Sequence, residues 1–336
     1  MNMRVSFIST FLPDRCGLAT YAARVLPFIE QAAQVKRVIV PYGQSFFFRR
    51  EVPIFMRAKV DLVHINFECA LYGQNIIPLL LWLRLKKIPV VLTLHSHNPY
   101  DWPNRYLNLW INKLAQRIVV HSPKTAARYG YIHIPHGGPD NPYLKEGKRG
   151  GADGPRFVHT GFVRENKRVD EIIRVFSHRQ DLRLVIGGTY QGRKPSPYYK
   201  RCRELFERNS GNITWHDSFM SENEFLRVYA DADVLVLFHG PGQDNYQSGL
   251  VSDALASGLP VLAPPLPGMK EQIPAKCGYL LDGFEVSDLE IGLDVAKEHY
   301  REWQSTLADL RTDFLWENIA GEYVRIYQEL LDNGRN

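Results

Sequence analysis

Short runs rich in Val and Ile alternate with helical patterns along most of the chain, and this alternation restricts the fold more than any other feature. In the first half we expect strands over residues 4–9, 35–40, 62–65, 90–94 and 118–121. Helical patterns over 19–32 and 76–85 lie between some of them. Such alternation is typical of a parallel sheet with helices on both faces.

A segment without apolar periodicity, residues 145–155, interrupts this pattern. It is rich in Gly and charged residues, which is typical of a linker. The alternation then starts again, with a helix expected over 169–177 and strands over 156–160, 182–187, 213–215, 234–238 and 260–263. The sequence therefore predicts an α/β fold of two Rossmann-like domains, with a cleft between the carboxyl ends of the two sheets.

The linker divides the chain of 336 residues into two parts that are each long enough to bury a full core. We expect a first domain over residues 1–150 and a second domain over residues 151–315. The remaining segment, 316–336, carries an amphipathic pattern over 316–331, which predicts a helix that packs on a domain surface.

Charge is distributed unevenly between the two halves. Residues 1–150 contain 20 Lys and Arg and 8 Asp and Glu, a balance of +12, whereas residues 151–336 contain 21 and 28, a balance of −7. The basic half is expected to meet an anionic partner, either a membrane surface or a phosphorylated lipid. Nucleic acid ranks last because the sequence has no RNA-binding signature. Residues 46–50 and 81–87 pair apolar groups with cations, which fits a peripheral membrane contact and equally fits core aromatics and a solvated helix end.

The chain has the sequence character of a cytoplasmic protein. Its N-terminus has one Arg and a short apolar run over residues 5–8, which predicts a buried strand and not a signal peptide. The most apolar window, residues 76–85, is too short to span a bilayer. The four cysteines are far apart and lack a Cys-x-x-Cys pair, which argues against a disulfide framework and a structural zinc site.

The segment NYQSGLVSDALASGLPVLAP, residues 245–264, predicts a polar turn, a short helix, a Gly stop and a strand. A helix start offers unpaired N–H groups and a positive dipole end, and the small residues Ser248 and Gly249 allow a phosphate to come close. Asp253 lies further along the helix and can accept hydrogen bonds from hydroxyl groups of the same ligand. Taken alone, the pattern also fits an ordinary helix with a polar cap.

Two further turns follow predicted strands. Gly161 ends the first strand of the second domain and is followed by Arg164 and Lys167, two cations that can neutralise a diphosphate. Gly17 lies between the first strand and the first helix, where it permits a ligand to approach the helix start. It is a weak signal by itself, because no Gly-x-Gly-x-x-Gly is present.

Together these segments resemble the retaining nucleotide-sugar glycosyltransferases of family 4, of the bacterial exopolysaccharide and glycolipid type, which have the GT-B fold. The resemblance extends over essentially the whole chain. It is carried by residues 13–21, 64–68, 93–97, 134–138, 161–167, 231–236 and 249–261, of which the last two segments are the most specific. The tail helix matches the one that crosses back to the first domain in this fold.

The resemblance implies a hexosyltransferase of EC class 2.4. Such an enzyme transfers a sugar from a UDP- or GDP-sugar to a hydroxyl group of a glycan or a lipid-linked acceptor. The reaction is expected to proceed with retention and without a metal ion or a cofactor. A cytoplasmic enzyme associated with the inner face of the membrane fits this activity.

The resemblance also assigns roles to residues. The expected donor-binding set is Gly17, Gly161, Arg164, Lys167, Asn245, Gln247, Ser248, Gly249, Leu250 and Asp253. Within it, Lys167 and Arg164 hold the diphosphate with backbone groups at Ser248 and Gly249, and Asp253 meets the ribose. The expected catalytic set is His95, Lys167 and Arg164, and either His95 or His97 faces the sugar. The expected acceptor side consists of Asp14, Arg15, Glu68 and His97.

The sequence departs from the family pattern in two places. The family carries two glutamates where this chain has Asn245 and Asp253. Asn245 removes a negative charge near the donor sugar and leaves the identity of that sugar open. Gln243, Asp244 and Gln247 are the other residues that can take the place of the missing glutamate. An Arg of the family is replaced by Phe162, and Arg164 is expected to take its place.

Two other functions stay open at this point. One is a nucleotide-sugar epimerase of the same fold. The other is a nucleotide-sugar-binding protein without transfer activity, which the loss of the glutamate at Asn245 favours. A metal site is not expected, because the Asp-x-Asp motif at residues 231–233 precedes a predicted buried strand and the histidines match no zinc spacing.

Overall fold

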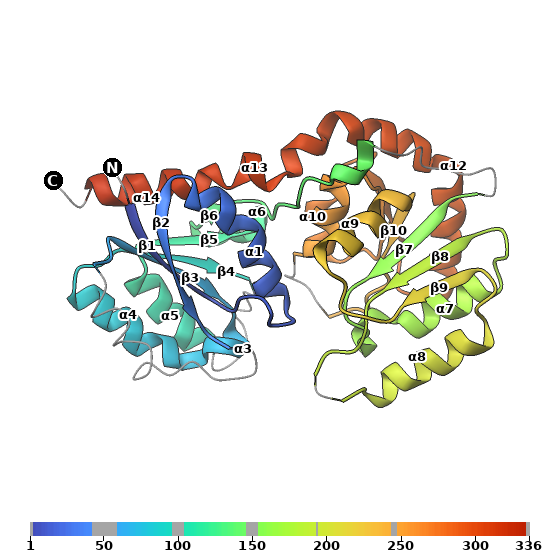
Figure 1. Cartoon of the computed structure of the whole chain (residues 1–336), viewed down its shortest axis with the longest axis horizontal. Helices are drawn as coiled ribbons and strands as arrows, with labels where there is room; N and C mark the ends of the chain where they lie inside the picture. Colours follow the sequence, from blue (N-terminus) through green and yellow to red (C-terminus); the bar gives the residue numbers. More distant parts are fainter. Residues whose placement is uncertain are drawn as a thin grey trace. The chain divides into compact units, whose positions relative to one another are not determined.

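The computed structural model describes residues 3–41, 59–95, 104–145, 154–192, 194–242 and 247–333. The chain divides into two compact units (Figure 1). The first contains Met1–His136, Asn245–Gln247 and Trp316–Asn336, and the second contains Gly137–Asp244 and Ser248–Leu315. The division at residue 136 lies ahead of the expected boundary at residue 150. Most of the expected linker lies outside the described residues.

The first unit is built around a parallel sheet, for which the structure describes six strands in the order β2-β1-β3-β4-β5-β6. These strands are β1 (Met3–Ser9), β2 (Ala33–Ile39), β3 (Leu62–Phe67), β4 (Val90–Leu94), β5 (Arg117–Val120) and β6 (Ile132–His133). β3 is buried at every position. Complete burial is expected for a central strand that helices cover on both sides.

Helices cover both faces of the first sheet. They are α1 (Gly17–Glu30), α3 (Cys69–Tyr72), η1 (Gly73–Asn75), α4 (Ile76–Leu85), α5 (Asn104–Leu114), α6 (Pro123–Tyr129), α13 (Trp316–Ile319) and α14 (Gly321–Asn333). α1, α13 and α14 form one core with the sheet, in which Phe7, Tyr21 and Tyr327 are buried. α3, α4 and α5 form the core on the other face, around Leu80 and Leu92. The last segment of the chain is therefore part of the first unit.

The second unit repeats this plan, with six described strands in the order β12-β11-β10-β7-β8-β9. They are β7 (Arg156–Thr160), β8 (Arg183–Gly187), β9 (Ile213–His216), β10 (Val234–Val236), β11 (Val261–Ala263) and β12 (Gly278–Leu280). Each pairs in parallel with its neighbours. This confirms the predicted α/β architecture of two parallel sheets.

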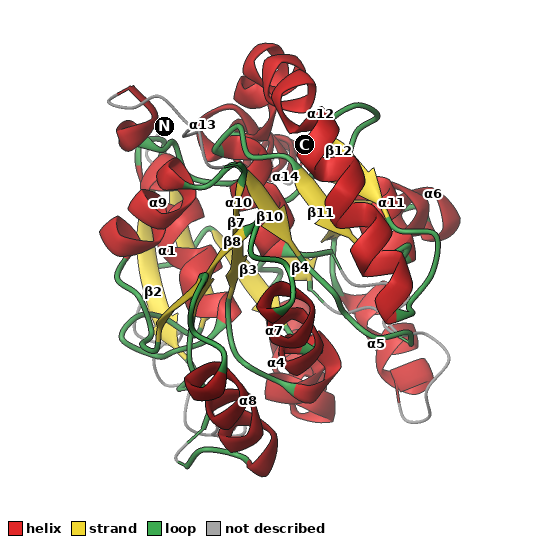
Figure 2. Cartoon of the chain, turned by 90° about the vertical axis from the view of Figure 1, so that its right-hand side faces the viewer, coloured by secondary structure: helices red, strands yellow, loops and turns green. Residues whose placement is uncertain are grey.

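Helices also lie on both faces of the second sheet (Figure 2). They are η2 (Pro142–Lys145), η3 (Glu165–Lys167), α7 (Val169–Ser177), α8 (Pro197–Arg208), α9 (Glu222–Asp231), α10 (Gly249–Ala256), α11 (Pro267–Gln272), α12 (Val286–Leu310) and η4 (Arg311–Phe314). α7, α8 and α12 pack on one face. α9, α10 and α11 pack on the other. None of the described helices combines the length and hydrophobicity needed to cross a bilayer.

Most predicted elements lie within two residues of the observed ones. The first helix begins at Gly17, because Sγ of Cys16 accepts a hydrogen bond from the N–H of Ala19 at 3.4 Å and caps the helix. The predicted strand over 234–238 ends at Val236. The predicted tail helix is interrupted between Ile319 and Gly321.

Candidate functional site

The strand order of the second sheet identifies the place where a ligand is expected. From β7 the chain first adds β8 and β9 on one side of the sheet. It then returns to the other side of β7 and adds β10, β11 and β12. Ligands of open α/β sheets bind beyond the carboxyl ends of the strands at such a reversal. Gly161 follows β7 at this edge, and His239 and Gly240 lie just beyond β10.

Gly161 and Lys167 are in contact at this reversal. Gly161 has a φ of +100°, which residues with a side chain rarely adopt. A Cβ atom at this position would lie 2.7 Å from Lys167 Nζ and 3.3 Å from Leu250 Cδ1. The N–H of Gly161 donates to the carbonyl of Gly187 at 2.9 Å, which ties the turn to β8. The Lys167 ammonium can therefore lie beside the end of β7 because residue 161 has no side chain.

The ammonium of Lys167 is partly desolvated and forms no ion pair with a carboxylate of the described residues. Burial, followed by repulsion from the guanidinium of Arg164, lowers the pKa of Lys167 to about 8. An unpaired cation in such surroundings attracts an anionic ligand, because a lysine without a partner keeps all three N–H donors.

Two buried histidines lie close to Lys167. Burial lowers the pKa of His159 to about 4 and that of His239 well below its usual range, and the Lys167 charge adds to both effects. Nδ1 of His159 donates to the carbonyl of Val236 at 2.9 Å, so Nε2 carries the lone pair. Nε2 of His159 and Nδ1 of His239 have no hydrogen-bond partner within the described ranges. Because such buried atoms are rare, the two rings provide hydrogen-bonding capacity that a ligand can use.

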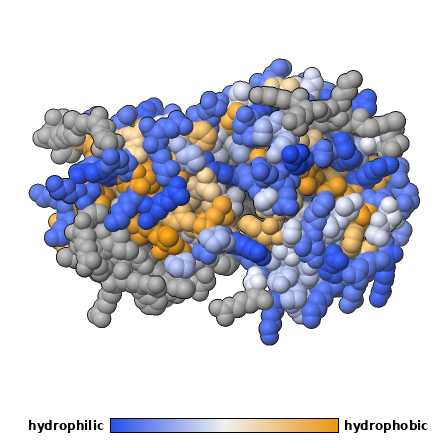
Figure 3. All heavy atoms as spheres, viewed as in Figure 1, coloured by the Kyte–Doolittle hydropathy of each residue, from blue (hydrophilic) through white to orange (hydrophobic). Residues whose placement is uncertain are grey.

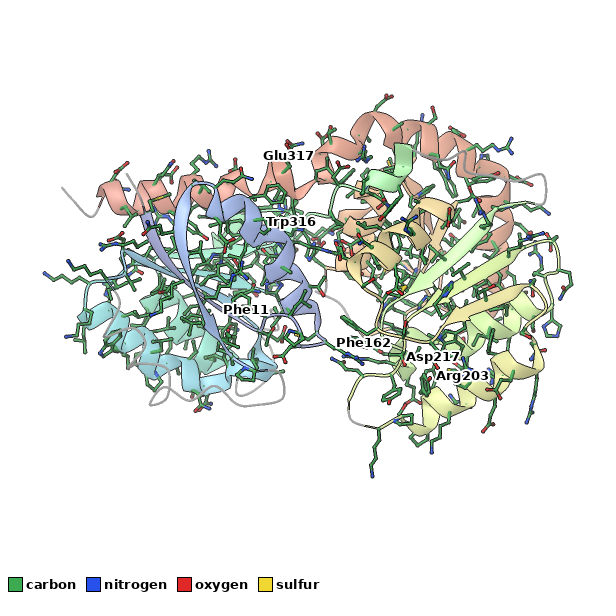
Figure 4. All side chains as sticks on the ribbon, in the orientation of Figure 1. Phe11, Phe162, Arg203, Asp217, Trp316 and Glu317 are labelled. Carbon is green, nitrogen blue, oxygen red and sulfur yellow. The ribbon has the colours of Figure 1, made fainter. Side chains whose placement is uncertain are left out.

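The neighbouring arginines differ in their availability. Arg164 is exposed, and its guanidinium carbon lies 5.7 Å from the ring centre of Phe162 (Figure 4). Arg168 is already occupied, since it forms an ion pair with Glu171 and donates to the carbonyl of Phe284. Of these two arginines, Arg164 is therefore the one able to contact a phosphate group beside Lys167.

The start of α10 offers fewer donors than the sequence suggested. The N–H of Ser248 donates to Oε1 of Gln272 at 2.6 Å, and Nε2 of Gln272 donates to the carbonyl of Ser248 at 3.1 Å. The Ser248 N–H is therefore occupied in this structure, and a contact between Ser248 and the donor phosphates stays a prediction. Among the described residues no acceptor faces the N–H groups of Gly249 and Leu250, so these two remain able to bind an anion.

The other predicted donor-site residues are placed as follows. Asp253 lies on α10 and is 4% exposed, whereas Gln247 is half-buried ahead of the helix. Asn245, with the alternatives Gln243 and Asp244, lies outside the described residues. The predicted contact between Asp253 and a ribose stays a prediction.

The Asp-x-Asp motif has a structural use in the second unit. Oδ2 of Asp233 accepts a hydrogen bond from the N–H of Arg156 at 2.8 Å, and the side chain of Asp233 is fully buried. It thereby holds the start of β7 beside the end of α9. Across the described ranges no group of three or more His, Cys, Asp and Glu side chains is arranged to hold a metal ion.

The same edge of the first sheet carries the predicted acceptor-side residues. β1 lies at its reversal, between β2 and β3. Gly17 begins α1, and a Cβ atom there would have nothing within 4 Å, so the helix start is open. On the preceding turn Asp14 is half-buried and Arg15 is exposed, and Glu68 follows β3. His97 lies outside the described residues.

His95 follows β4 at this edge, and its ring is held by Asn66. Nε2 of His95 is hydrogen-bonded to Oδ1 of Asn66, and Nδ2 of Asn66 donates to Oγ of Ser9 at 3.0 Å. In this arrangement Nε2 carries the proton and Nδ1 the lone pair. Burial, with repulsion from His121, His136 and His64, lowers the pKa of His95 well below its usual range. His95 therefore offers a neutral hydrogen-bond acceptor.

Tyr21 of α1 lies at the centre of a ring cluster that includes His95. The ring centre of Tyr21 is 4.5 Å from that of His95, 5.3 Å from that of His136 and 5.1 Å from that of Trp316. Trp316 comes from the tail of the chain and lies beside α1 (Figure 4). The tail segment thus completes the surroundings of His95.

Hydrogen bonds tie α14 to the same strands. The hydroxyl of Tyr323 is 2.6 Å from that of Tyr21. The hydroxyl of Tyr327 is hydrogen-bonded to Nδ1 of His64, whose Nε2 is 2.8 Å from Oγ1 of Thr93. All these side chains are buried. Residues of α14 therefore support β3 and β4 just before Asn66 and His95.

Sequence analysis missed several residues of these surroundings. They are Asn66, His159, His239 and Gln272. His239 had a recognisable signal, because it is a polar residue directly after an apolar strand and before Gly-Pro-Gly. Gln272 had none, since its contact with Ser248 joins residues 24 positions apart.

Two family models match the chain. The model described as Glycosyltransferase Family 4 matches residues 16–137, and the model described as Glycosyl transferases group 1 matches residues 154–291. The matches cover parts of both units and include Gly17, His95, Gly161, Lys167 and Gly249.

Curated relatives are similar over part of their length. A GDP-mannose:glycolipid 4-beta-D-mannosyltransferase of Xanthomonas campestris pv. campestris is 27% identical over 189 residues, which are 55% of this chain and 53% of the relative. Sulfoquinovosyl transferase SQD2 of Arabidopsis thaliana is 22% identical over 267 residues, 69% of this chain and 49% of the relative. The chain thus spans about half the length of the curated relatives it matches.

Solved structures of similar fold cover the chain almost completely. Sucrose-phosphate synthase from Thermosynechococcus elongatus has a TM-score of 0.74 at 16% identity and covers 99% of this chain and 100% of its own. HepE from Anabaena, in complex with UDP and glucose, has a TM-score of 0.74 at 12% identity and covers 97% and 100%. At these identities the likeness demonstrates the fold.

Proposed function

The chain is a family 4 glycosyltransferase of the GT-B fold, and from this premise we propose that it transfers a hexosyl group from a nucleoside diphosphate sugar to a hydroxyl group of a glycan or lipid-linked acceptor. The observation that carries the proposal is Lys167, held against Gly161 at the reversal of the second sheet with no carboxylate partner in the described residues. A diphosphate supplies the negative charge and the acceptor oxygens that these surroundings lack.

The first donor to test is GDP-mannose. Two curated relatives from Xanthomonas, at 27% and 26% identity, are named for transfer from GDP-mannose to a glycolipid. UDP-glucose is the second donor, because HepE structures contain UDP with glucose. The glycolipid in the relatives' name also supports a lipid-linked acceptor for this chain.

In the proposed reaction the bond between the anomeric carbon and the donor diphosphate breaks, and the acceptor oxygen forms a bond to the same carbon. The diphosphate leaves with the electron pair and takes up the acceptor proton. Lys167, Arg164 and the N–H groups of Gly249 and Leu250 stabilise the charge that develops on the leaving group. His95, as a neutral acceptor, orients a hydroxyl group of the bound sugars.

Family membership favours retention at the anomeric carbon, and we propose this outcome without a metal ion. The name of the Xanthomonas relatives specifies a β bond, which requires inversion of the α-linked mannosyl group of GDP-mannose. With this donor an α product would therefore support retention in this chain, and a β product would refute it. Proton NMR of the product reads the anomer directly. Retention requires that product and donor have the same anomeric configuration, and the opposite configuration refutes it.

The test is release of GDP from GDP-mannose, and of UDP from UDP-glucose, in EDTA with and without a bacterial glycolipid extract. We expect release that depends on the extract and incorporation of labelled sugar into lipid. Lys167→Ala should lower the rate at least about 100-fold, since it removes a charged contact to the leaving group. Donor binding without release would identify a binding protein, and conversion of the donor sugar without acceptor would identify an epimerase.

A further inference from the structure

α4 and α5 expose apolar side chains on the surface of the first unit. On α4, Leu81 and Leu85 are 41% and 81% exposed. On α5, Tyr106, Leu109 and Trp110 are 53%, 53% and 42% exposed. Single exposed apolar residues are common, but these five make up more than half of the nine large apolar side chains that are exposed in the described residues.

The exposed residues form stripes on two neighbouring helices. Their spacing of three or four residues places them on one side of each helix. α4 and α5 pack side by side on the same face of the first sheet (Figure 1). On the view of Figure 3, hydrophobic residues reach the surface of the first unit beside hydrophilic ones. The outer side of a surface helix is normally polar, so this pair of helices is unusual.

The charge around these stripes is almost entirely positive. Residues 69–139 contain eight Lys and Arg and one acidic residue, Asp101. On α4, the turn after it and the part of α5 whose side chains the structure describes, the exposed cations are Arg84, Lys86, Lys87 and Lys113. No carboxylate of the described residues pairs with any of these four.

We propose that the outer face of α4 and α5, defined by Leu81, Leu85, Tyr106, Leu109, Trp110 and the four cations, docks on an anionic lipid bilayer. Apolar and aromatic side chains enter the interfacial layer, where Trp and Tyr are favoured. Each cation near an anionic surface adds to the attraction. This surface lies outside the donor site and goes beyond the proposed transfer activity.

A second copy of the chain is a poorer partner for this face. In a symmetric dimer the same patch meets itself, which would bring Arg84, Lys86, Lys87 and Lys113 against their own copies without any carboxylate in between. An anionic bilayer satisfies the apolar stripes and the cations together. The charge complementarity therefore selects the membrane.

Docking also has a consequence for transfer to a lipid-linked acceptor. Such an acceptor is confined to the bilayer, and a bound enzyme meets it at a raised effective concentration. Loss of docking should therefore slow transfer to a lipid-linked acceptor in vesicles. It should leave nucleotide binding unchanged.

Flotation of the purified protein with vesicles tests the proposal. Vesicles of phosphatidylcholine alone are compared with vesicles that also contain phosphatidylglycerol, at low and high salt. We expect flotation with the anionic vesicles, weakened by salt. The double variants Leu85→Ser/Trp110→Ser and Lys86→Glu/Lys87→Glu should each bind at least about tenfold more weakly.

The matched control is Ile291→Ser, which removes an apolar side chain of 54% exposure from α12 in the second unit. It should float like the unaltered protein. Thermal unfolding and GDP binding of each variant separate loss of docking from misfolding and from failure of the donor site. Equal binding to both kinds of vesicle, or unchanged flotation of both double variants, overturns the proposal. A concentration-dependent dimer that Leu85→Ser/Trp110→Ser abolishes, with no vesicle binding, would assign the face to a second copy instead.

Discussion

Lys167 Nζ lies so close to the α-carbon of Gly161 that a methyl group on that carbon would come within 2.7 Å of it. The contact joins the end of β7 to the short helix η3. It fixes a positive charge at the point where the order of the second sheet reverses. The identity of residue 161 therefore controls the position of the proposed phosphate-binding group.

Gly161→Ala should weaken nucleotide binding. The new methyl group displaces the ammonium, and alanine is strained at a φ of +100°. We expect the dissociation constant for GDP or UDP to rise at least about 30-fold, which corresponds to roughly 2 kcal/mol. Calorimetric titration measures it.

The matched control is Gly192→Ala. Gly192 has a φ of +110°, but a Cβ atom there has nothing within 4 Å. The Gly192→Ala variant therefore has the backbone strain but no steric clash. Its melting temperature should fall while its nucleotide affinity stays unchanged. Equal affinities of the two variants would refute the role of the Gly161–Lys167 contact.

Nucleotide affinity should decrease as the pH rises above about 8. The pKa of Lys167 is lowered by burial to about 8, so the free protein loses this positive charge in that range. Only the protonated form attracts a diphosphate, and binding at higher pH requires uptake of a proton. Affinity should therefore fall up to about tenfold for each pH unit above 8.

Lys167→Arg provides the control for this profile. A guanidinium stays protonated throughout the range, so affinity of the arginine variant should vary little with pH. Titrations at several pH values measure both proteins. A flat profile for the unaltered protein would contradict the assignment of Lys167 to the phosphate site.

Asn66→Asp should make transfer activity sensitive to acid. A carboxylate beside Nε2 of His95 favours the imidazolium and raises its pKa. As pH falls through the raised value, His95 becomes charged and Nδ1 stops being an acceptor. NMR titration of His95 reads the shift, and the low-pH limb of the kcat profile should move with it.

Asn66→Ala is the comparison for that experiment. It removes the hydrogen bond without adding charge, so it should lower kcat while leaving the position of the low-pH limb unchanged. If the aspartate and alanine variants have the same pH profile, the Asn66–His95 bond has only a structural role.

His121 should make the first unit less stable in acid. Burial is the main cause that lowers its pKa in the folded protein to about 4, whereas the unfolded chain has a pKa of about 6.5. Between these values the unfolded state binds the extra proton, so stability is full above pH 6.5 and decreases as pH falls toward 4. At about pH 5.5 one such histidine costs about 1 kcal/mol of unfolding free energy.

Urea unfolding of His121→Gln checks this effect. Glutamine does not titrate and can still donate to the carbonyl of Ile134, which His121 Nδ1 contacts at 2.8 Å. The loss of stability from about pH 7.5 to 5.5 should be smaller in the variant by about 1 kcal/mol. An unchanged loss would show that His121 does not contribute to acid sensitivity.

The elements that sequence analysis predicted well are those with strong local signals. β4 and α7 were predicted at the bounds they have, because β4 is a short run rich in Val and Leu and the apolar residues of α7 repeat with the period of a helix. α12 was not assigned, although Leu289, Leu293 and Ala296 repeat on one side of it. Its many charged residues reduce the contrast between its two sides.

The candidate site was predictable only in part, for a physical reason. Gly161, Lys167 and Gly249 could be proposed from the sequence because glycines and cations at strand and helix ends form a recognisable local pattern. The hydrogen bond between Gln272 and Ser248, and that between Asn66 and His95, join residues distant in the chain. Such contacts arise from packing and have no local pattern. The sequence therefore contains no sign that the Ser248 N–H already has an acceptor.

The most direct test of the central claim is calorimetric titration of GDP, GMP, UDP and UMP into the protein and into Lys167→Ala. If Lys167 binds the donor diphosphate, one of the diphosphates should bind at least about tenfold more tightly than its monophosphate. This preference should disappear in the alanine variant. Equal affinity for diphosphate and monophosphate, or a preference that survives Lys167→Ala, would contradict the account.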